Sequence, residues 1–145
     1  MKFLIQRVKN ASVEINKNEV GKIEKGFVVL IGITHEDNKE KADLLVKKLM
    51  NLRVFEDEKG KMNLSLKDVK GELLLVSQFT LYANCKEGNR PSFTEAAKPD
   101  FAKDIYEYIV KECKKEIPKV ETGVFGEYME VNLINDGPVT IMLER

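Results

Sequence analysis

The sequence predicts an α+β fold, a compact single domain over residues 1–145 in which mixed β-sheets are layered with two main helices. Three observations lead to this prediction. Short apolar segments of strand length recur along the chain, a continuous β-branched run lies in its first third, and two segments repeat apolar residues at helical spacing. A chain rich in strands with two helices favours sheets and helices packed in layers.

The first third of the chain predicts four strands joined by turns, at residues 3–9, 11–15, 19–24 and 27–33. Asn16, Lys17 and Asn18 tolerate turn geometry, and Lys25-Gly26 supplies the next turn. The run from Phe27 to Ile33 is apolar throughout and rich in β-branched side chains. We therefore expect a strand that is buried on both faces.

Two helices are expected. Asp37 or Asn38 is the N-cap of the first, whose apolar residues recur at helical spacing as Ala42, Leu45, Leu49 and Leu52. Pro99 is a favourable first-turn residue for the second helix, which should run to about Glu116. The apolar face of this second helix is predicted from Phe101, Ile105, Tyr108 and Ile109.

Strands fill most of the remaining sequence and are expected at residues 62–66, 72–79, 120–125, 128–134 and 139–143. The first of these is interpreted as a short edge strand and the second as a central strand. Residues 83–92 are polar and contain glycine, so they predict a loop.

Composition is ordinary for a soluble globular protein, with 43% hydrophobic and 33% charged residues. No apolar run approaches the roughly 20 residues that a membrane helix needs, and the first residues do not form a signal peptide. Cys85 and Cys113 are far apart and no CxxC pair occurs, which favours two unpaired thiols in a reducing compartment. We therefore expect a cytoplasmic protein with no membrane partner.

The charge balance limits contact with nucleic acids. The chain has 24 basic and 24 acidic side chains, so its net charge is zero. Proteins that bind long stretches of nucleic acid backbone usually have a basic excess. Any contact with RNA should therefore be local and short.

Two polar segments interrupt apolar strands and predict a functional site. Ser77, Gln78 and Thr80 interrupt an apolar run that begins at Leu73. Gly137-Pro138 removes one backbone donor and restricts the chain just before the apolar residues 139–143. We expect the two segments to be halves of one pocket. Taken alone, the first segment is better interpreted as a strand end whose Ser and Thr cap a turn. The second alone is typical of an ordinary turn between hairpin strands.

The single histidine excludes several kinds of chemistry. His35 alone cannot form a histidine-rich metal site, no HExxH motif or cysteine cluster assists it, and it lies in neither polar segment. We expect it to be a surface loop histidine. No GxGxxG or GxxxxGK[ST] motif occurs, so dinucleotide and P-loop sites are excluded. The sequence predicts neither a metal nor a cofactor.

The polar segments carry a resemblance to a known family. SQFTLYA at residues 77–83 and NDGPVT at residues 135–140 resemble the two signature motifs of the D-aminoacyl-tRNA deacylases. Flanking segments follow the family's order as well: Arg7-Val8 with Ala11-Ser12-Val13, the loop at residues 88–93, and Phe125-Gly126 with Met129. The likeness covers essentially the whole chain. It implies an enzyme that hydrolyses the ester between a D-amino acid, or glycine, and the 3′-terminal adenosine of tRNA.

The resemblance also implies a homodimer with its active site at the subunit interface. Ser77, Gln78, Phe79 and Thr80 match the family's catalytic segment. Family members carry a cis Gly-Pro peptide, here Gly137-Pro138, that reaches into the partner's pocket. Its carbonyl groups face the substrate's α-carbon and exclude an L side chain, so chirality is selected by rejection. The expected binding partner is the 3′ acceptor end of D-aminoacyl-tRNA.

Three more residues receive roles from the resemblance. Phe125 and Met129 match the positions that hold the terminal adenine, and an aromatic face with a thioether suits a purine. Core packing is the competing reading for both. Arg7 is expected to support Gly137-Pro138 from behind, against the alternative of a surface salt bridge. The intervening Glu127-Tyr128 departs from the small or other polar residues common in the family, so Tyr128 receives no role.

The mechanism is open between two nucleophiles. Thr80 would need a group that accepts its proton, and Gln78 cannot ionise. The alternative is assistance by the ribose 2′-OH of the substrate, with backbone amides of Phe79 and Thr80 stabilising the oxyanion. The absence of a base in the segment favours the second.

Two other functions compete with a deacylase. A binding module could recognise an aminoacyl-RNA end without cleaving it, and cleavage of D-Tyr-tRNA with an L-Tyr-tRNA control separates these readings. A small-molecule esterase would need an activated nucleophile, which the sequence does not display.

Overall fold

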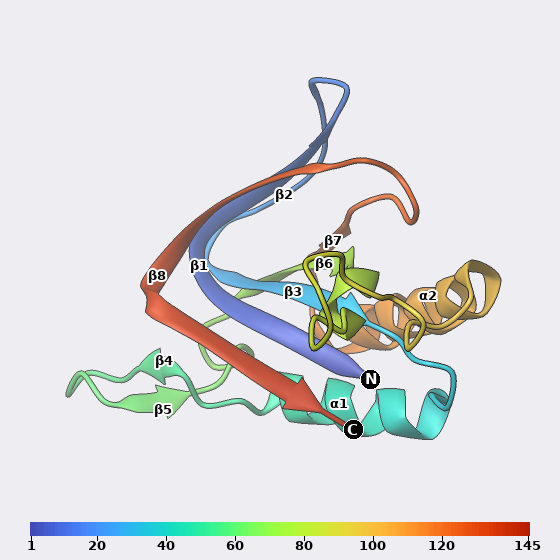
Figure 1. Ribbon diagram of the computed structural model, residues 1–145. Helices are drawn as coiled ribbons and strands as arrows, with labels where there is room; N and C mark the ends of the chain where they lie inside the picture. Colours follow the sequence, from blue (N-terminus) through green and yellow to red (C-terminus); the bar gives the residue numbers. More distant parts are fainter.

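The computed structural model describes residues 1–145, and its main sheet is organised around one long strand. β1 (Lys2–Ile15) pairs antiparallel with β3 (Gly26–Gly32) in its first half and with β2 (Asn18–Ile23) in its second. β8 (Glu130–Glu144) runs antiparallel along the other edge of β1. β6 (Glu72–Ser77) and β7 (Val120–Thr122) extend the sheet in parallel with β3. The sheet is mixed, as predicted (Figure 1).

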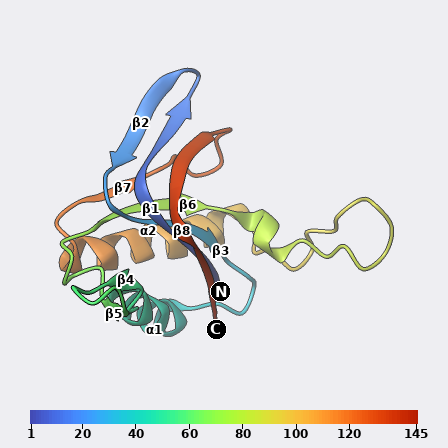
Figure 2. The same cartoon turned by 90° about the vertical axis from the view of Figure 1, so that its left-hand side faces the viewer.

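Both helices cover the same face of the sheet (Figures 1 and 2). α1 (Lys39–Met50) and α2 (Pro99–Glu116) pack against each other and against a cluster of 23 buried residues contributed by the helices and the sheet. A second cluster of 7 buried residues lies on the opposite face, where β1 and β2 curl over β3 and β6. Because β3 contributes to both clusters, the prediction of a strand buried on both faces is confirmed, and with it the layered α+β fold.

Two predicted strand breaks are wrong. Residues 3–9 and 11–15 belong to the continuous β1, and residues 139–143 belong with most of residues 128–134 to β8. Gly137-Pro138 therefore lies inside a strand instead of in a turn between two strands. It is tolerated because Gln6 pairs with Thr140 and Val8 with Asn135, which leaves residues 136–139 without partners on β1. A bulge of this kind removes the need for a proline amide.

Three other strands are shorter than predicted. β6 ends at Ser77 because the chain turns there into a short 3₁₀ helix, η1 (Phe79–Tyr82), and β7 ends at Thr122. β5 (Met62–Leu64) is not an edge of the main sheet but pairs with β4 (Phe55–Glu56) in a separate hairpin. The Asp57 carboxylate closes this hairpin by accepting from the amides of Lys59 and Lys61, at 2.9 and 3.0 Å.

The predicted helices are present. Asn38 is the N-cap of α1 and accepts from the Lys41 amide at 2.9 Å. Leu52 lies beyond α1, because the Asn51 amide already closes the last turn. On α2, Tyr106 is buried beside Ile105 and Ile109, whereas the predicted Phe101 is exposed and Tyr108 is half-buried. No helix combines the length and apolarity that crossing a membrane requires.

Candidate active site

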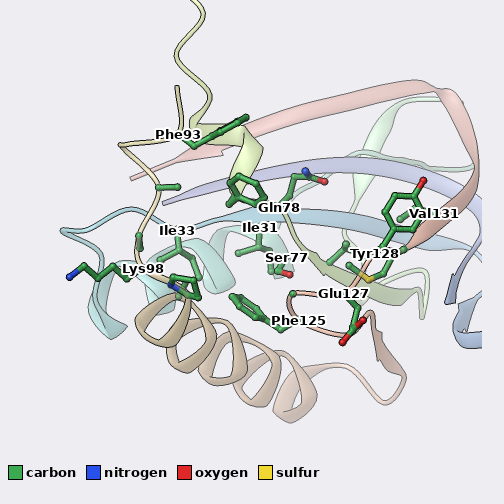
Figure 3. A pocket seen from close by; sticks show the side chains of 18 residues that line it. Ile31, Ile33, Ser77, Gln78, Phe93, Lys98, Phe125, Glu127, Tyr128 and Val131 are labelled. Atoms are coloured by element: carbon green, nitrogen blue, oxygen red, sulfur yellow. The ribbon is translucent and has the colours of Figure 1, made fainter. Parts of the chain in front are cut away.

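A cavity of about 650 Å³ lies beyond the carboxyl ends of β3 and β6 (Figure 3). Its walls come from these strand ends, the start of η1, the segment that leads into α2, and residues 125–131. Twelve of its 18 lining residues are hydrophobic. Ligands in open sheets bind preferentially beyond the carboxyl ends of parallel strands, so the position suits a substrate site.

The structure brings five of the residues predicted from the sequence to this cavity: Ser77, Gln78, Phe79, Phe125 and Met129. Main-chain pairing holds the first two, since Ser77 pairs with Ile31 and the Gln78 amide donates to the Ile31 carbonyl at 2.8 Å. η1 begins immediately afterwards. The first turn of a helix leaves its amides without partners inside the helix, and in η1 this turn begins with Phe79 and Thr80.

Thr80 does not line the cavity. It is an exposed residue of η1, and its hydroxyl accepts a hydrogen bond from the side-chain amide of Gln78. No carboxylate, imidazole or amine bonds to this hydroxyl. The arrangement thus lacks the proton acceptor that a threonine nucleophile requires.

Phe125 and Met129 are half-buried and line the cavity. The Phe125 ring packs at 5.9 Å from the ring of Tyr106 on α2, which fixes its orientation. Met129 closely approaches Gly123, where a Cβ would collide with the thioether sulfur. Both side chains contact the core and also border the cavity, so core packing and ligand contact are compatible at these positions.

Ionisable groups are confined to the rim of the cavity. Among its lining residues only Lys98, Glu127 and Tyr128 can carry a charge, and all three are exposed. Nearby, the Tyr106 hydroxyl donates to the Leu75 carbonyl at 2.8 Å, and burial raises the pKa of Tyr106, so it stays a neutral donor. The polar groups at the end of β6 are therefore neutral ones.

The second motif forms a braced projection from β8. The Gly137-Pro138 bond is cis, as the resemblance implies, and both residues are exposed. The Asn135 side chain bonds both backbone groups of Val139, accepting from its amide at 2.7 Å and donating to its carbonyl at 3.2 Å. This clamp closes the chain around Asp136, Gly137 and Pro138.

Arg7 braces the same projection from inside. It is buried, and its Nε donates to the Asp136 carbonyl at 2.8 Å while a second guanidinium nitrogen donates to the carbonyl of Val54. Its Nε also lies 3.7 Å from the Asp136 carboxylate. The alternative considered from the sequence, a salt bridge on the surface, is therefore wrong, because the guanidinium of Arg7 is buried.

The two motifs do not share one pocket within a chain. Gly137 and Pro138 are absent from the cavity lining. β8 pairs with β1, and both β1 and β3 lie between it and β6, so sheet order separates the motifs. The expectation that the two motifs form one pocket is therefore wrong within a single chain.

His35 lies outside the cavity but holds one of its walls. Its Nε2 lies 2.8 Å from the Thr94 carbonyl, and the Thr34 hydroxyl donates to the carbonyl of Glu95. The Ala97 amide donates to the Ile33 carbonyl at 2.9 Å. Sequence reasoning missed the wall itself, which is formed by Phe93, Ala96, Ala97, Lys98, Pro99 and Ala102. Its only signal is a run of small residues before the helix.

Comparison with known proteins identifies the family. A family model described as D-Tyr-tRNA(Tyr) deacylase matches residues 4–144. A D-aminoacyl-tRNA deacylase of Thermosipho africanus is 58% identical over 144 residues, covering 99% of this chain and 97% of the relative. A protein of the same name from Clostridium acetobutylicum is 52% identical over 144 residues, with 99% and 97% covered.

Solved structures share the fold of this chain. A structure described as c-Myc DNA unwinding element binding protein has a TM-score of 0.95 and 41% identity, covering 100% of this chain and 99% of that chain. A structure described as a probable eukaryotic D-amino acid tRNA deacylase has a TM-score of 0.84, with 98% and 97% covered; at 16% identity it supports the fold alone. The chain belongs to the D-Tyr-tRNA(Tyr) deacylase family.

Proposed function

We propose that this chain, acting as a single domain over residues 1–145, hydrolyses the ester between a D-amino acid, or glycine, and the 3′-terminal adenosine of tRNA. The observation that carries the proposal is the cavity at the end of β6. It combines neutral polar groups of Ser77 and Gln78 with an apolar wall that includes Phe125 and Met129. The chain's similarity to proteins named D-aminoacyl-tRNA deacylase supports this substrate class. The proposal includes a cytoplasmic location for the activity.

The neutral character of the site supports a mechanism assisted by the substrate. The only side-chain hydrogen bond of the Thr80 hydroxyl is with the Gln78 amide, which cannot take its proton. The 2′-OH of the terminal ribose is adjacent to the ester in the substrate itself and needs no protein group to bring it there. In this proposal Phe125 and Met129 hold the adenine, Ser77 and Gln78 orient the ester, and the amides of Phe79 and Thr80 stabilise the oxyanion.

Enantiomer selection is assigned to Gly137-Pro138 of a second subunit. The projection is exposed, braced by Asn135 and Arg7, and far from the cavity in sheet order. Exposed apolar side chains of β8, Ile134 and Met142, supply a surface suited to a second copy. In the resulting homodimer, the rigid carbonyl groups would face the α-carbon and leave no space for an L side chain.

Release of D-tyrosine from D-Tyr-tRNA, beside an L-Tyr-tRNA control, tests the activity. We expect rapid release of the D enantiomer only. Equal cleavage of both, or of neither, contradicts the proposal, and the second result would favour binding without cleavage. The solution mass tests the dimer separately, since a monomer near 16.6 kDa would leave the cavity without its filter.

A further inference from the structure

Exposed aromatic side chains gather at the mouth of the cavity. The chain exposes four aromatic residues, and three of them, Phe79, Phe93 and Tyr128, line this one cavity. The fourth, Phe101, lies elsewhere on α2. Exposed aromatic rings grouped at one opening are characteristic of surfaces that bind a flat ligand or another macromolecule.

Tyr128 differs from the other two because its ring has no partner. Phe79 and Phe93 pack edge to face, with ring centroids 5.0 Å apart. Tyr128 is 86% exposed, compared with 57% for Phe79 and 37% for Phe93. Its ring belongs to no aromatic or cation–π pair, and its hydroxyl makes no hydrogen bond within the chain. Folding therefore leaves one full aromatic face available at the rim.

The position of Tyr128 relates it to the nucleotide next to the terminal adenosine. It directly precedes Met129 and lies three residues after Phe125, and Figure 3 shows its ring at the edge of the cavity away from Phe93. If Phe125 and Met129 hold the adenine, the RNA strand leaves the cavity past this rim. The preceding base, which is a cytosine in tRNA, is then the nearest flat group that Tyr128 can meet.

The neighbouring charge favours a base over a phosphate at this point. Glu127 lines the same rim and repels a phosphate group, whereas a carboxylate can accept a hydrogen bond from the amino group of cytosine. Lys98, the one cation of the lining, stands on the other side of the cavity from Glu127 (Figure 3). A base is therefore favoured over a phosphate beside Glu127 and Tyr128.

We propose that Tyr128 forms a stacking site for the base that precedes the terminal adenosine. This inference rests on the proposed function and adds a second nucleotide to its binding site. Stacking of a base on an aromatic side chain strengthens binding, and this site should contribute roughly tenfold to affinity.

Binding of adenosine and of the dinucleotide CpA, measured by calorimetric titration, tests the site without requiring catalysis. The unmodified protein should bind CpA about tenfold more tightly than adenosine. Tyr128→Ala should abolish this difference while leaving adenosine affinity unchanged, and Tyr128→Phe should preserve it. Phe101→Ala, which removes an exposed aromatic ring outside the cavity, is the matched control and should change neither affinity.

Each other outcome overturns the inference. Equal weakening of both ligands in Tyr128→Ala would assign the residue to the adenine itself, and no weakening of either would assign it no contact. A change in the solution mass of Tyr128→Ala, with CpA affinity retained, would assign the ring to a subunit interface. The proposed function fails separately, since its failure would be seen as absent D-tyrosine release from D-Tyr-tRNA, whereas the stacking site is judged by the preference for CpA.

Discussion

The end of β6 and the projection of β8 each carry a polar motif, but the fold holds them by different means. Ser77 and Gln78 are fixed by main-chain pairing with β3 and lie in a largely apolar cavity. Gly137-Pro138 is exposed, has no partner on β1, and is held by the side chains of Asn135 and Arg7. The motif at the end of β6 therefore lines a cavity of its own chain, whereas the motif of β8 is exposed on the surface.

In the proposed function, this difference separates ester cleavage from the selection of one enantiomer. A segment fixed by sheet pairing can hold an ester against donors whose positions do not change. A projection braced by side chains can present rigid carbonyl groups to a second molecule. If chemistry and selection are divided in this way, substitutions in the two regions should have different kinetic effects.

Gly137→Ala should have the largest effect, and this effect should be confined to discrimination between the D and L substrates. Gly137 has a φ of 146°, and an added Cβ would lie 2.9 Å from the Val139 amide nitrogen, so the carbonyl groups must move. Backbone strain of roughly 3 kcal/mol corresponds to a change on the order of a hundredfold. We expect the ratio of kcat/KM for D-Tyr-tRNA to that for L-Tyr-tRNA to fall by this factor.

Gly88→Ala is the matched control. Gly88 also has a positive φ, 68°, but an added Cβ meets no atom within 4 Å. The enantiomer ratio should stay unchanged in this variant. An unaltered ratio in Gly137→Ala would contradict the role assigned to the projection.

Arg7→Ala should have the next largest effect. It leaves the enclosed carbonyls of Asp136 and Val54 without their donor, which should lower the free energy of unfolding by about 2–4 kcal/mol in urea titrations. The enantiomer ratio should fall roughly tenfold, less than in Gly137→Ala because Asn135 still clamps the projection. Arg7→Lys retains the charge but not the planar guanidinium, so we expect partial recovery of both the stability and the enantiomer ratio. Loss of stability with an intact ratio would limit Arg7 to packing.

Most of the fold followed from local patterns in the sequence. Apolar periodicity predicted both helices and the buried strand at residues 27–33, because these patterns reflect burial that each segment undergoes wherever it packs. The continuity of β8 did not follow. It depends on a bulge opposite Arg7, a contact between residues far apart in the chain, whereas proline locally predicts a break.

The candidate site, like the fold, was predicted from the sequence only in part. Motif order predicted Ser77, Gln78, Phe79, Phe125 and Met129, which line the cavity. It also predicted Thr80, which does not line it. The wall at residues 93–99 was not predicted, because its position depends on hydrogen bonds to Ile33 and His35, which follow β3 and are far from it in the sequence. Tyr128 had no assigned role, since only the three-dimensional arrangement reveals that its ring is unpartnered.

Thr80→Ala should have a smaller effect, on chemistry alone. If the substrate's 2′-OH assists cleavage, removing the Thr80 hydroxyl should lower kcat less than tenfold, about the value of one lost hydrogen bond. The enantiomer ratio should not change. A D-aminoacyl substrate ending in 2′-deoxyadenosine should be cleaved poorly by the unmodified enzyme. Complete loss of turnover in a folded Thr80→Ala protein would instead assign the nucleophile to Thr80.

His35→Ala should have the smallest effect, because it loosens a wall without touching either motif. The variant removes the contact between Nε2 and the Thr94 carbonyl, one of several bonds that hold this wall against residues 33–35, which follow β3. A lost hydrogen bond of about 1 kcal/mol corresponds to roughly a fivefold rise in KM, with kcat and the enantiomer ratio unchanged.

His35→Gln supplies the control that distinguishes positioning from catalysis. The glutamine amide can donate to the same carbonyl but cannot exchange protons with a substrate. The KM of His35→Gln should therefore return close to that of the unmodified enzyme. Recovery in His35→Gln would mean that the only histidine of the chain acts through the wall. A large fall in kcat in both variants would mean that the cavity depends on an ionisable group after all, and would undermine the division between a neutral catalytic region and a separate selecting one.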